Sequence, residues 1–310
     1  MLASLFSKTK PINYILVSVL LGLAFVLFQF MHLEATSVYS LLKTVGVLGI
    51  LVFTVFLIQF IVLRNRLVSD NAYVPLLFLS FILMFPNIML NARLVVANFF
   101  ILLALRRLYS LHSLKNPQEK LFDASLWILI ATLFHFWSVF YIVLIFYAVA
   151  SYVSRDYKNW LIPFIALFVV FIFLSVYLIL VDETYLEWIQ TKTVISFDFT
   201  QFDNLFINLA LAVFASIALL FFFAELIHFK KKQFNLQSSY KKVILSFIIA
   251  VAIYIVSNGK NEGSLLFTFF PLAILGSNYI EMVPQNWRKE AIVYSVFGIA
   301  VFFFVSQLIL

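Results

Sequence analysis

The ionisable side chains that lie inside or at the edge of long apolar stretches of this sequence include Arg93, His135, Lys260 and Glu262. An ionisable group among apolar neighbours needs a partner, water or a ligand, so each is a candidate functional residue. A guanidinium can bind phosphate oxygens through two hydrogen bonds, and an ammonium group adds a second positive charge. Arg93 and Lys260 therefore predict an anion site. An imidazole or a carboxylate can act as a general base, the role predicted for His135 or Glu262.

Polar residues near these groups are predicted to contact the same ligand: Asn91, Ser138 and Asn261. A structural role is the alternative at every position. Arg93 also fits an interfacial arginine that pairs with a carboxylate such as Glu262. His135 also fits a hydrogen-bonded histidine at a helix end, and residues 258–264, rich in glycine and asparagine, also fit a solvated turn. The sequence leaves both interpretations open.

The composition identifies the class of protein. Of the 310 residues, 64% are hydrophobic, 11% are charged and 39 are phenylalanine, and the mean hydropathy is +1.07. Such a chain has too little polar surface for a soluble globule. Apolar runs of about 18 residues or more recur along it, the length that an α-helix needs to cross a bilayer. The alternating pattern of a transmembrane barrel is absent, so we predict an all-α polytopic bundle, a single integral membrane domain over residues 1–310.

Several chemistries are excluded by what the sequence lacks. The chain has no cysteine, which rules out disulfides, thiolate metal sites and a thiol nucleophile. The four histidines show no metal-ligand spacing, and no nucleotide-binding motif occurs. We therefore predict no metal and no cofactor. We attribute the net charge of +7 to loops that face anionic lipid headgroups, not to a nucleic-acid partner.

Ten apolar segments are candidates for crossing the membrane. They are residues 13–31, 40–63, 73–90, 91–105, 121–154, 160–181, 205–228, 243–257, 264–281 and 290–310. As one helix, residues 121–154 would be about 50 Å long, well beyond the thickness of the hydrocarbon layer. As two crossings with a turn near 135–138, they raise the total from ten to about eleven.

The distribution of lysine and arginine favours the turn. With it, all but four of the 21 basic side chains fall on one side of the membrane; the four are Lys43, Arg93, Lys192 and Lys260. Because cytoplasmic loops carry an excess of lysine and arginine, we assign that basic side, and the N-terminus with it, to the cytoplasm. The candidate residues then share the opposite side. Residues 182–204, acidic and rich in aromatic side chains, are predicted to lie along the periplasmic membrane surface.

A central region resembles a known family of enzymes. It begins with Asn91-Ala92-Arg93-Leu94-Val95-Val96-Ala97, continues through a helix that ends in Arg106-Arg107, and closes with Ala131-Thr132-Leu133-Phe134-His135-Phe136-Trp137-Ser138. This order is similar to the centre of the EpsG-type and Wzy-like polysaccharide polymerases. The matching residues are Arg93, Ala97, His135 and Ser138. The likeness covers about 60 of the 310 residues, and the family more often has glutamine and glycine where this chain has Ala92 and Leu94.

The resemblance implies transfer of a glycan between undecaprenyl-pyrophosphate carriers at the periplasmic face of a bacterial inner membrane. We therefore expect a polymerase- or transferase-like protein whose ligands are membrane lipids and a lipid-linked saccharide. Residues 1–13 and 258–273 are also similar to an uncharacterised family of Bacteroidota inner-membrane proteins, which implies a source and no activity. Whether the chain is an enzyme stays open. The alternatives are a non-catalytic subunit of an envelope or secretion assembly, with membrane-protein partners, and a transporter.

Overall fold

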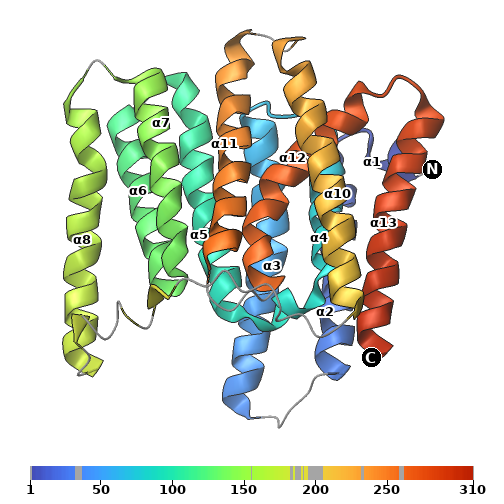
Figure 1. The fold of residues 1–310 in the computed structure, drawn as a ribbon, viewed down its shortest axis with the longest axis horizontal. Helices are drawn as coiled ribbons and strands as arrows, with labels where there is room; N and C mark the ends of the chain where they lie inside the picture. Colours follow the sequence, from blue (N-terminus) through green and yellow to red (C-terminus); the bar gives the residue numbers. More distant parts are fainter. Residues whose placement is uncertain are drawn as a thin grey trace.

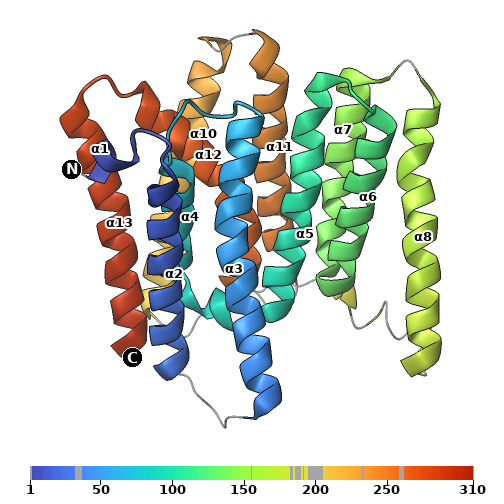
Figure 2. The ribbon, with the colours of Figure 1, turned by 180° about the vertical axis from the view of Figure 1, so that it is seen from behind.

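Every regular element in the described part of the chain is helical. The computed structural model describes residues 2–31, 37–154, 156–181, 184–185, 190, 192–194, 205–231, 234–257 and 262–309. The helices stand side by side and run alternately in opposite directions, as Figure 1 and, from behind, Figure 2 show. The N-terminus lies toward one end of the bundle and the C-terminus toward the other.

The elements differ greatly in length. The longer helices are α2 (Pro11–Met31), α3 (Val38–Arg64), α5 (Ala92–Tyr109), α6 (Pro117–Phe134), α8 (Lys158–Val181), α10 (Leu205–His228), α11 (Phe234–Val256), α12 (Leu266–Met282) and α13 (Asn286–Ile309). The shorter ones are α1 (Leu2–Phe6), α4 (Tyr73–Met84) and α7 (Ile142–Tyr152). Five 3-10 turns join them: η1 (Pro86–Leu90), η2 (Ser110–Ser113), η3 (Phe136–Tyr141), η4 (Phe229–Lys231) and η5 (Glu262–Leu265).

The lengths and compositions of these helices are those of a multi-pass membrane protein, as the composition predicts. Eight helical segments of the described chain are long and apolar enough to cross a membrane. Two shorter apolar helices accompany them, Tyr73–Met84 and Phe136–Tyr152. Within a helix the backbone N–H and C=O groups bond to each other. This apolar chain can therefore enter a membrane with its peptide groups hydrogen-bonded.

Helix α4, with only 12 residues, lies with α12 at the centre of the bundle. All 12 residues of α4 are buried, and α12 is buried along nearly its whole length. Four phenylalanines fill the space between α4, α10 and α12, with ring centroids 5.3–6.2 Å apart: Phe81, Phe85, Phe214 and Phe269. Edge-to-face ring pairs of this kind stabilise a core beyond the effect of burial alone.

The peripheral helix α8 shows the opposite pattern of burial. It packs against α6, yet Phe164, Phe168 and Phe173 are exposed. In water this surface would be strongly unfavourable, whereas lipid tails are as apolar as the side chains themselves. The exposed phenylalanines of α8 therefore form a lipid-facing surface.

Residues 121–154, ambiguous in the sequence, fold back on themselves. Helix α6 ends at Phe134, His135 takes an extended backbone conformation (φ −141°, ψ 104°), and the chain continues through η3 into α7. Figures 1 and 2 show α6 and α7 side by side. The turn predicted near 135–138 from the charge distribution is therefore present.

Three of the 3-10 turns, η1, η3 and η5, gather at one end of the bundle, which we call the cavity end. The sequence predicts one span over 73–90, but α4 stops at Met84 because Phe85 precedes Pro86 and is not helical (φ −134°, ψ 69°). At 12 residues α4 is only about 18 Å long, shorter than the hydrocarbon layer. Helices α2 and α3 continue beyond η1 in Figure 2. The turns η1 and η5, which pack against each other, thus form a floor that lies short of the ends of α2 and α3.

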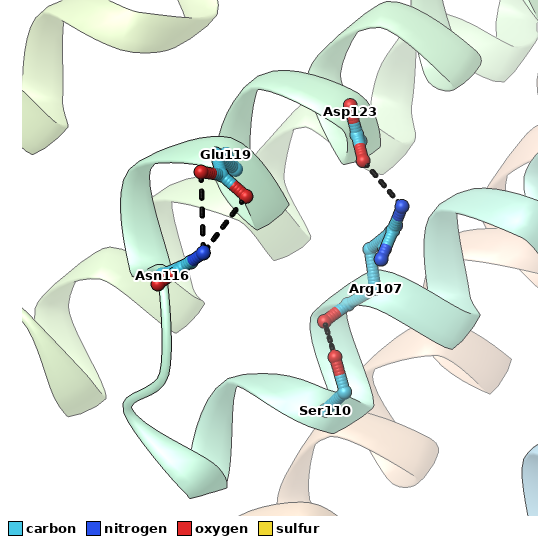
Figure 3. A network of polar contacts seen from close by, with 5 residues as sticks. All are labelled: Arg107, Ser110, Asn116, Glu119 and Asp123. Atoms are coloured by element: carbon cyan, nitrogen blue, oxygen red, sulfur yellow. Dashed lines mark hydrogen bonds and ion pairs between the residues drawn. The ribbon is translucent and has the colours of Figure 1, made fainter.

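The opposite end, which we call the basic end, contains Arg64 in the last turn of α3 and Arg106 and Arg107 in the last turn of α5. Figure 3 shows the connection from α5 to α6 at this end. Arg107 forms an ion pair with Asp123 at 2.7 Å, and the Asn116 amide donates to Glu119. Local polar contacts therefore fix this connection.

Candidate functional site

A cavity of about 810 Å³ opens at the cavity end. It is lined by Tyr39 and Lys43 of α3, Asn87 and Leu90 of η1, Asn91, Ala92 and Arg93 at the start of α5, and Glu262 and Gly263 of η5. Helices α3 and α5 both begin at this end, and α11 and α12 are joined here, which is why segments distant in sequence meet. Cavities of several hundred Å³ are the size that small-molecule sites in proteins have.

The carboxylate in this cavity belongs to Glu262, whose side chain is only 5% exposed. The Asn87 amide donates a hydrogen bond to its Oε1 at 3.0 Å. Its Oε2 is buried and has no hydrogen-bond partner in the part of the chain that the structure describes. The ion pair with Arg93 considered from the sequence is therefore not the arrangement found. A neutral amide holds one carboxylate oxygen, and the other is buried without a partner among the described residues.

The cations in the cavity wall are Lys43 and Arg93, and both side chains are exposed. Neither forms an ion pair with a described residue; the ion pair of Arg107 and Asp123 lies at the other end of the bundle. Arg93 stands in the first turn of α5, where the helix dipole adds positive potential. The wall thus presents two positive charges that form no ion pair with a described residue, although Glu262 lines the same cavity.

The backbone around Arg93 is fixed by two features. Asn91 caps α5, since its Oδ1 accepts a hydrogen bond from the Leu94 N–H at 3.3 Å. Gly263 lies so close to α5 that an added Cβ would be 2.4 Å from Leu94 Cδ1 and 3.5 Å from Asn91 Nδ2. Asn91, predicted as a ligand contact, therefore lines the cavity and also positions the helix that carries Arg93.

His135 and Ser138 lie at the cavity end but do not line this cavity. The His135 Nε2 is 3.1 Å from Ser257 Oγ, and its ring stacks on Phe267 with centroids 5.4 Å apart. Ser138 is fully buried. Of the predicted site residues, the structure brings Asn91, Arg93 and Glu262 together and places His135 and Ser138 beside them. Lys260 and Asn261 lie outside the described residues, as does most of the predicted surface segment 182–204.

Three polar residues of the lining were not predicted as site residues: Tyr39, Lys43 and Asn87. Lys43 carried a usable signal, because it is a lone cation near the start of the apolar run 40–63, the same feature that singled out Arg93. Asn87 stands next to Pro86 at the break in the predicted span 73–90. Tyr39 carried no signal of its own, since an aromatic residue near a helix start is common at membrane surfaces.

The arrangement provides two chemical capabilities. The cations can bind a phosphate or pyrophosphate group, and the partly free Glu262 carboxylate can accept a proton from a hydroxyl. Among the described residues, no group of three or more histidine, aspartate or glutamate side chains is placed to hold a metal ion. The site is therefore defined by a cationic wall and a buried carboxylate.

Comparison with known families places the whole chain in one of them. Residues 1–309 match the Family of unknown function (DUF6427), and the protein belongs to that family. No curated protein and no solved structure matches the chain. The residues of the cavity are therefore the basis for the function proposed below.

Proposed function

We propose that this protein binds a phosphate- or pyrophosphate-bearing lipid in the cavity and acts on the saccharide attached to it, as a polymerase- or transferase-like membrane protein. The observation that carries the proposal is the wall formed by Lys43 and Arg93, two cations without ion-pair partners among the described residues, beside the buried Glu262. An undecaprenyl-pyrophosphate-linked glycan offers the matching chemistry, with a dense negative charge, sugar hydroxyls and an apolar tail.

The shape of the cavity end supports a lipid ligand. The floor lies short of the ends of α2 and α3, so a headgroup can reach the cations while its chain stays among apolar surfaces. Tyr39 and Leu90 of the lining are both exposed and provide an apolar side to the opening. This arrangement suits an amphiphile better than a free anion.

A transfer reaction would use the two parts of the site differently. The attacking hydroxyl of an acceptor sugar forms the new bond to the anomeric carbon of the donor and gives its proton to a base, for which Glu262 is placed. The carrier pyrophosphate leaves with the electron pair of the broken bond. Lys43 and Arg93 stabilise the charge that this leaving group develops.

The orientation that we propose follows from the charges. We propose about eleven crossings, counting α4, α6 and the η3–α7 segment, in a bacterial inner membrane. The arginines at the ends of α3 and α5 favour a cytoplasmic basic end, with the N-terminus there and the cavity on the periplasmic side.

The absence of cysteine allows a clean test of this orientation. We expect a single cysteine introduced by Val38→Cys, at the cavity end, to react with a membrane-impermeant maleimide on intact cells. A cysteine introduced by Ser113→Cys, at the basic end, should react only after the cells are permeabilised. The reverse pattern would contradict the proposed sidedness.

Binding of defined lipids tests the function itself. We expect the purified protein to bind undecaprenyl phosphate and undecaprenyl pyrophosphate more tightly than phosphatidylglycerol, whose phosphodiester carries a single charge. Arg93→Ala should weaken binding at least about tenfold and Arg93→Lys less, because lysine keeps the charge and loses the planar fork. Lys158→Ala, which removes an exposed lysine at the basic end, is the matched control. Equal binding of all three lipids would reject the proposal.

A non-catalytic membrane subunit is the second candidate, and the position of His135 favours it. The imidazole is engaged by Ser257 and Phe267 outside the cavity, which leaves Glu262 as the one described carboxylate or imidazole in the lining. A deletion strain separates the two candidates. Accumulation of lipid-linked glycan that Glu262→Gln fails to relieve indicates an enzyme, whereas relief by Glu262→Gln indicates a subunit.

A further inference from the structure

Three buried side-chain oxygen atoms on η3, α11 and η5 have no hydrogen-bond partner among the described residues. They are Ser138 Oγ, Tyr254 Oη and Glu262 Oε2. Their side chains are 0%, 9% and 5% exposed. Buried polar atoms in folded proteins are almost always paired, and ordered water often supplies the partner. Three such atoms at one end of the bundle therefore point to bound molecules between them.

His135 contributes a fourth polar group. Ser257 Oγ donates its hydrogen to the Ile253 carbonyl at 2.7 Å, so it can only accept from the His135 Nε2–H, 3.1 Å away. The neutral imidazole therefore carries its hydrogen on Nε2 and a free lone pair on Nδ1. His135 can thus accept a hydrogen bond or a proton through Nδ1.

The spacing of residues along η3 shows where Ser138 points. Ser138 and Tyr141 are three residues apart within η3, and a 3-10 helix has three residues per turn, so they share one face. The Tyr141 hydroxyl reaches the Phe267 carbonyl of α12 at 3.5 Å, and His135, just before η3, contacts Ser257, just after α11. Ser138 shares the face of Tyr141 and therefore points toward α12.

Tyr254 approaches the same place from α11. It precedes Ser257 by three residues, so both side chains lie on one side of the helix. The end of α11 packs against η3 and also against η5, which carries Glu262. Tyr254 thus lies on the part of α11 that is near both η3 and η5.

We propose that ordered water fills a polar seam between η3, α11 and η5 and connects Glu262 to His135 through hydrogen bonds. The seam is lined by His135, Ser138, Tyr254, Ser257 and Glu262. The two unpaired hydroxyls can each donate and accept, while the carboxylate oxygen and Nδ1 accept, which matches the two donors and two acceptors of a water molecule. His135 then helps to hold the water that is hydrogen-bonded to Glu262, and so acts as a positioning residue without lining the cavity.

The His135 ring is neutral at pH 7, because its burial lowers the pKa of the imidazole to about 4. The titratable or charged groups at this end, on the described elements packed against η3 or beside the seam, are Tyr141, Tyr254, Glu262 and Arg93. A hydrogen bond accepted by the neutral Nδ1 is therefore what links the imidazole to the seam.

Nitrogen-15 NMR of the four histidines at pH 7, in protein reconstituted into nanodiscs, tests this connection. We expect the His135 Nδ1 signal to have the chemical shift of a nitrogen that accepts a hydrogen bond. Tyr254→Phe and Glu262→Gln should each move this signal toward the value of a nitrogen without a donor. Tyr177→Phe, on the exposed surface of α8, is the matched control and should change nothing. An Nδ1 signal that Glu262→Gln leaves unmoved overturns the connection.

Thermal unfolding of the same proteins tests whether water is bound in the seam. If Ser138 Oγ and Tyr254 Oη hold water, Ser138→Ala and Tyr254→Phe lower the melting temperature. If these atoms are merely unpaired, replacing them leaves the melting temperature unchanged or raises it, and the proposal is overturned. The role of the seam in transfer rests on the proposed function, but both measurements are made without lipid ligand. Failure here is therefore distinguishable from failure to bind undecaprenyl phosphate.

Discussion

The two ends of the bundle differ in whether their charged groups form ion pairs and hydrogen bonds with the rest of the protein. At the basic end Arg107 pairs with Asp123, and the Lys242 ammonium, fully buried, donates to the Leu108 carbonyl at 2.7 Å and lies 4.6 Å from the centre of the Tyr152 ring. A lysine that satisfies the last carbonyls of α5 and packs on an aromatic ring ties α11 to α5 and α7.

A second network at the basic end is centred on Glu281. Its carboxylate accepts hydrogen bonds from the Ser69 N–H at 3.0 Å, the Ser69 hydroxyl at 2.7 Å and the Asn71 amide. Asn71 in turn accepts from Ser277 and from the Tyr73 N–H. The loop between α3 and α4 is thereby fastened to α12.

At the cavity end, by contrast, Lys43 and Arg93 have no ion pair with described residues, and Glu262 keeps one oxygen free. Charged groups are costly in so apolar a chain, and those of the basic end are stabilised by the fold. The two cations of the cavity end therefore join no helices through a described ion pair. In the proposed function, they bind the charged group of the ligand.

Breaking the Glu281 network should have the largest effect on stability. We expect Glu281→Ala to lower the free energy of unfolding by about 3 kcal/mol, because hydrogen bonds to a carboxylate are strong and their donors are left unpaired. Thermal unfolding in detergent measures it. Glu281→Gln, which keeps one acceptor oxygen, should lose about half as much; a loss below about 1 kcal/mol in Glu281→Ala would contradict the contrast between the ends.

Removing the cavity cations should affect binding and leave stability unchanged. We expect Lys43→Ala and Arg93→Ala each to reduce the affinity for undecaprenyl pyrophosphate about tenfold, and together about a hundredfold if they act independently. Neither should change the melting temperature, because neither side chain has an ion pair with a described residue. A clear loss of stability in either variant would show that the cation has a structural partner.

Adding a methyl group to the cavity floor, by Gly263→Ala, should have a smaller effect. Gly263→Ala places a Cβ against the Leu94 side chain and should push η5 away from the start of α5, where Arg93 stands. We expect a loss of about 1 kcal/mol in stability and a several-fold weaker affinity for the lipid. Gly298→Ala in α13, where an added Cβ meets no atom within 4 Å, is the control and should be neutral or slightly stabilising.

The smallest effect is expected for the ion pair of Figure 3. The side chains of Arg107 and Asp123 are 40% and 33% exposed, so Asp123→Ala should cost at most about 1 kcal/mol. High salt should reduce even this difference. A larger loss in thermal unfolding would mean that the connection between α5 and α6 contributes more to the fold than its exposure indicates.

Much of the site could be predicted because ionisable residues are conspicuous in an apolar chain. Arg93 and Glu262 were found in this way, and both line the cavity. The turn at His135 followed from the distribution of lysine and arginine, although no glycine or proline marks it. Asn87 was not predicted as a site residue, because a single amide in a loop has no pattern that distinguishes a partner for Glu262 from a solvated side chain.

The sequence by itself determined the helical membrane class, the apolar segments and the conspicuous charges, because these depend on composition and on order along the chain. Only the tertiary structure decided which of the charges meet. It placed Lys43 beside Arg93, gave Glu262 an amide partner instead of a guanidinium, and turned His135 toward Ser257. The reason is geometric: where a helix ends and which face it buries depend on packing against helices that are distant in sequence.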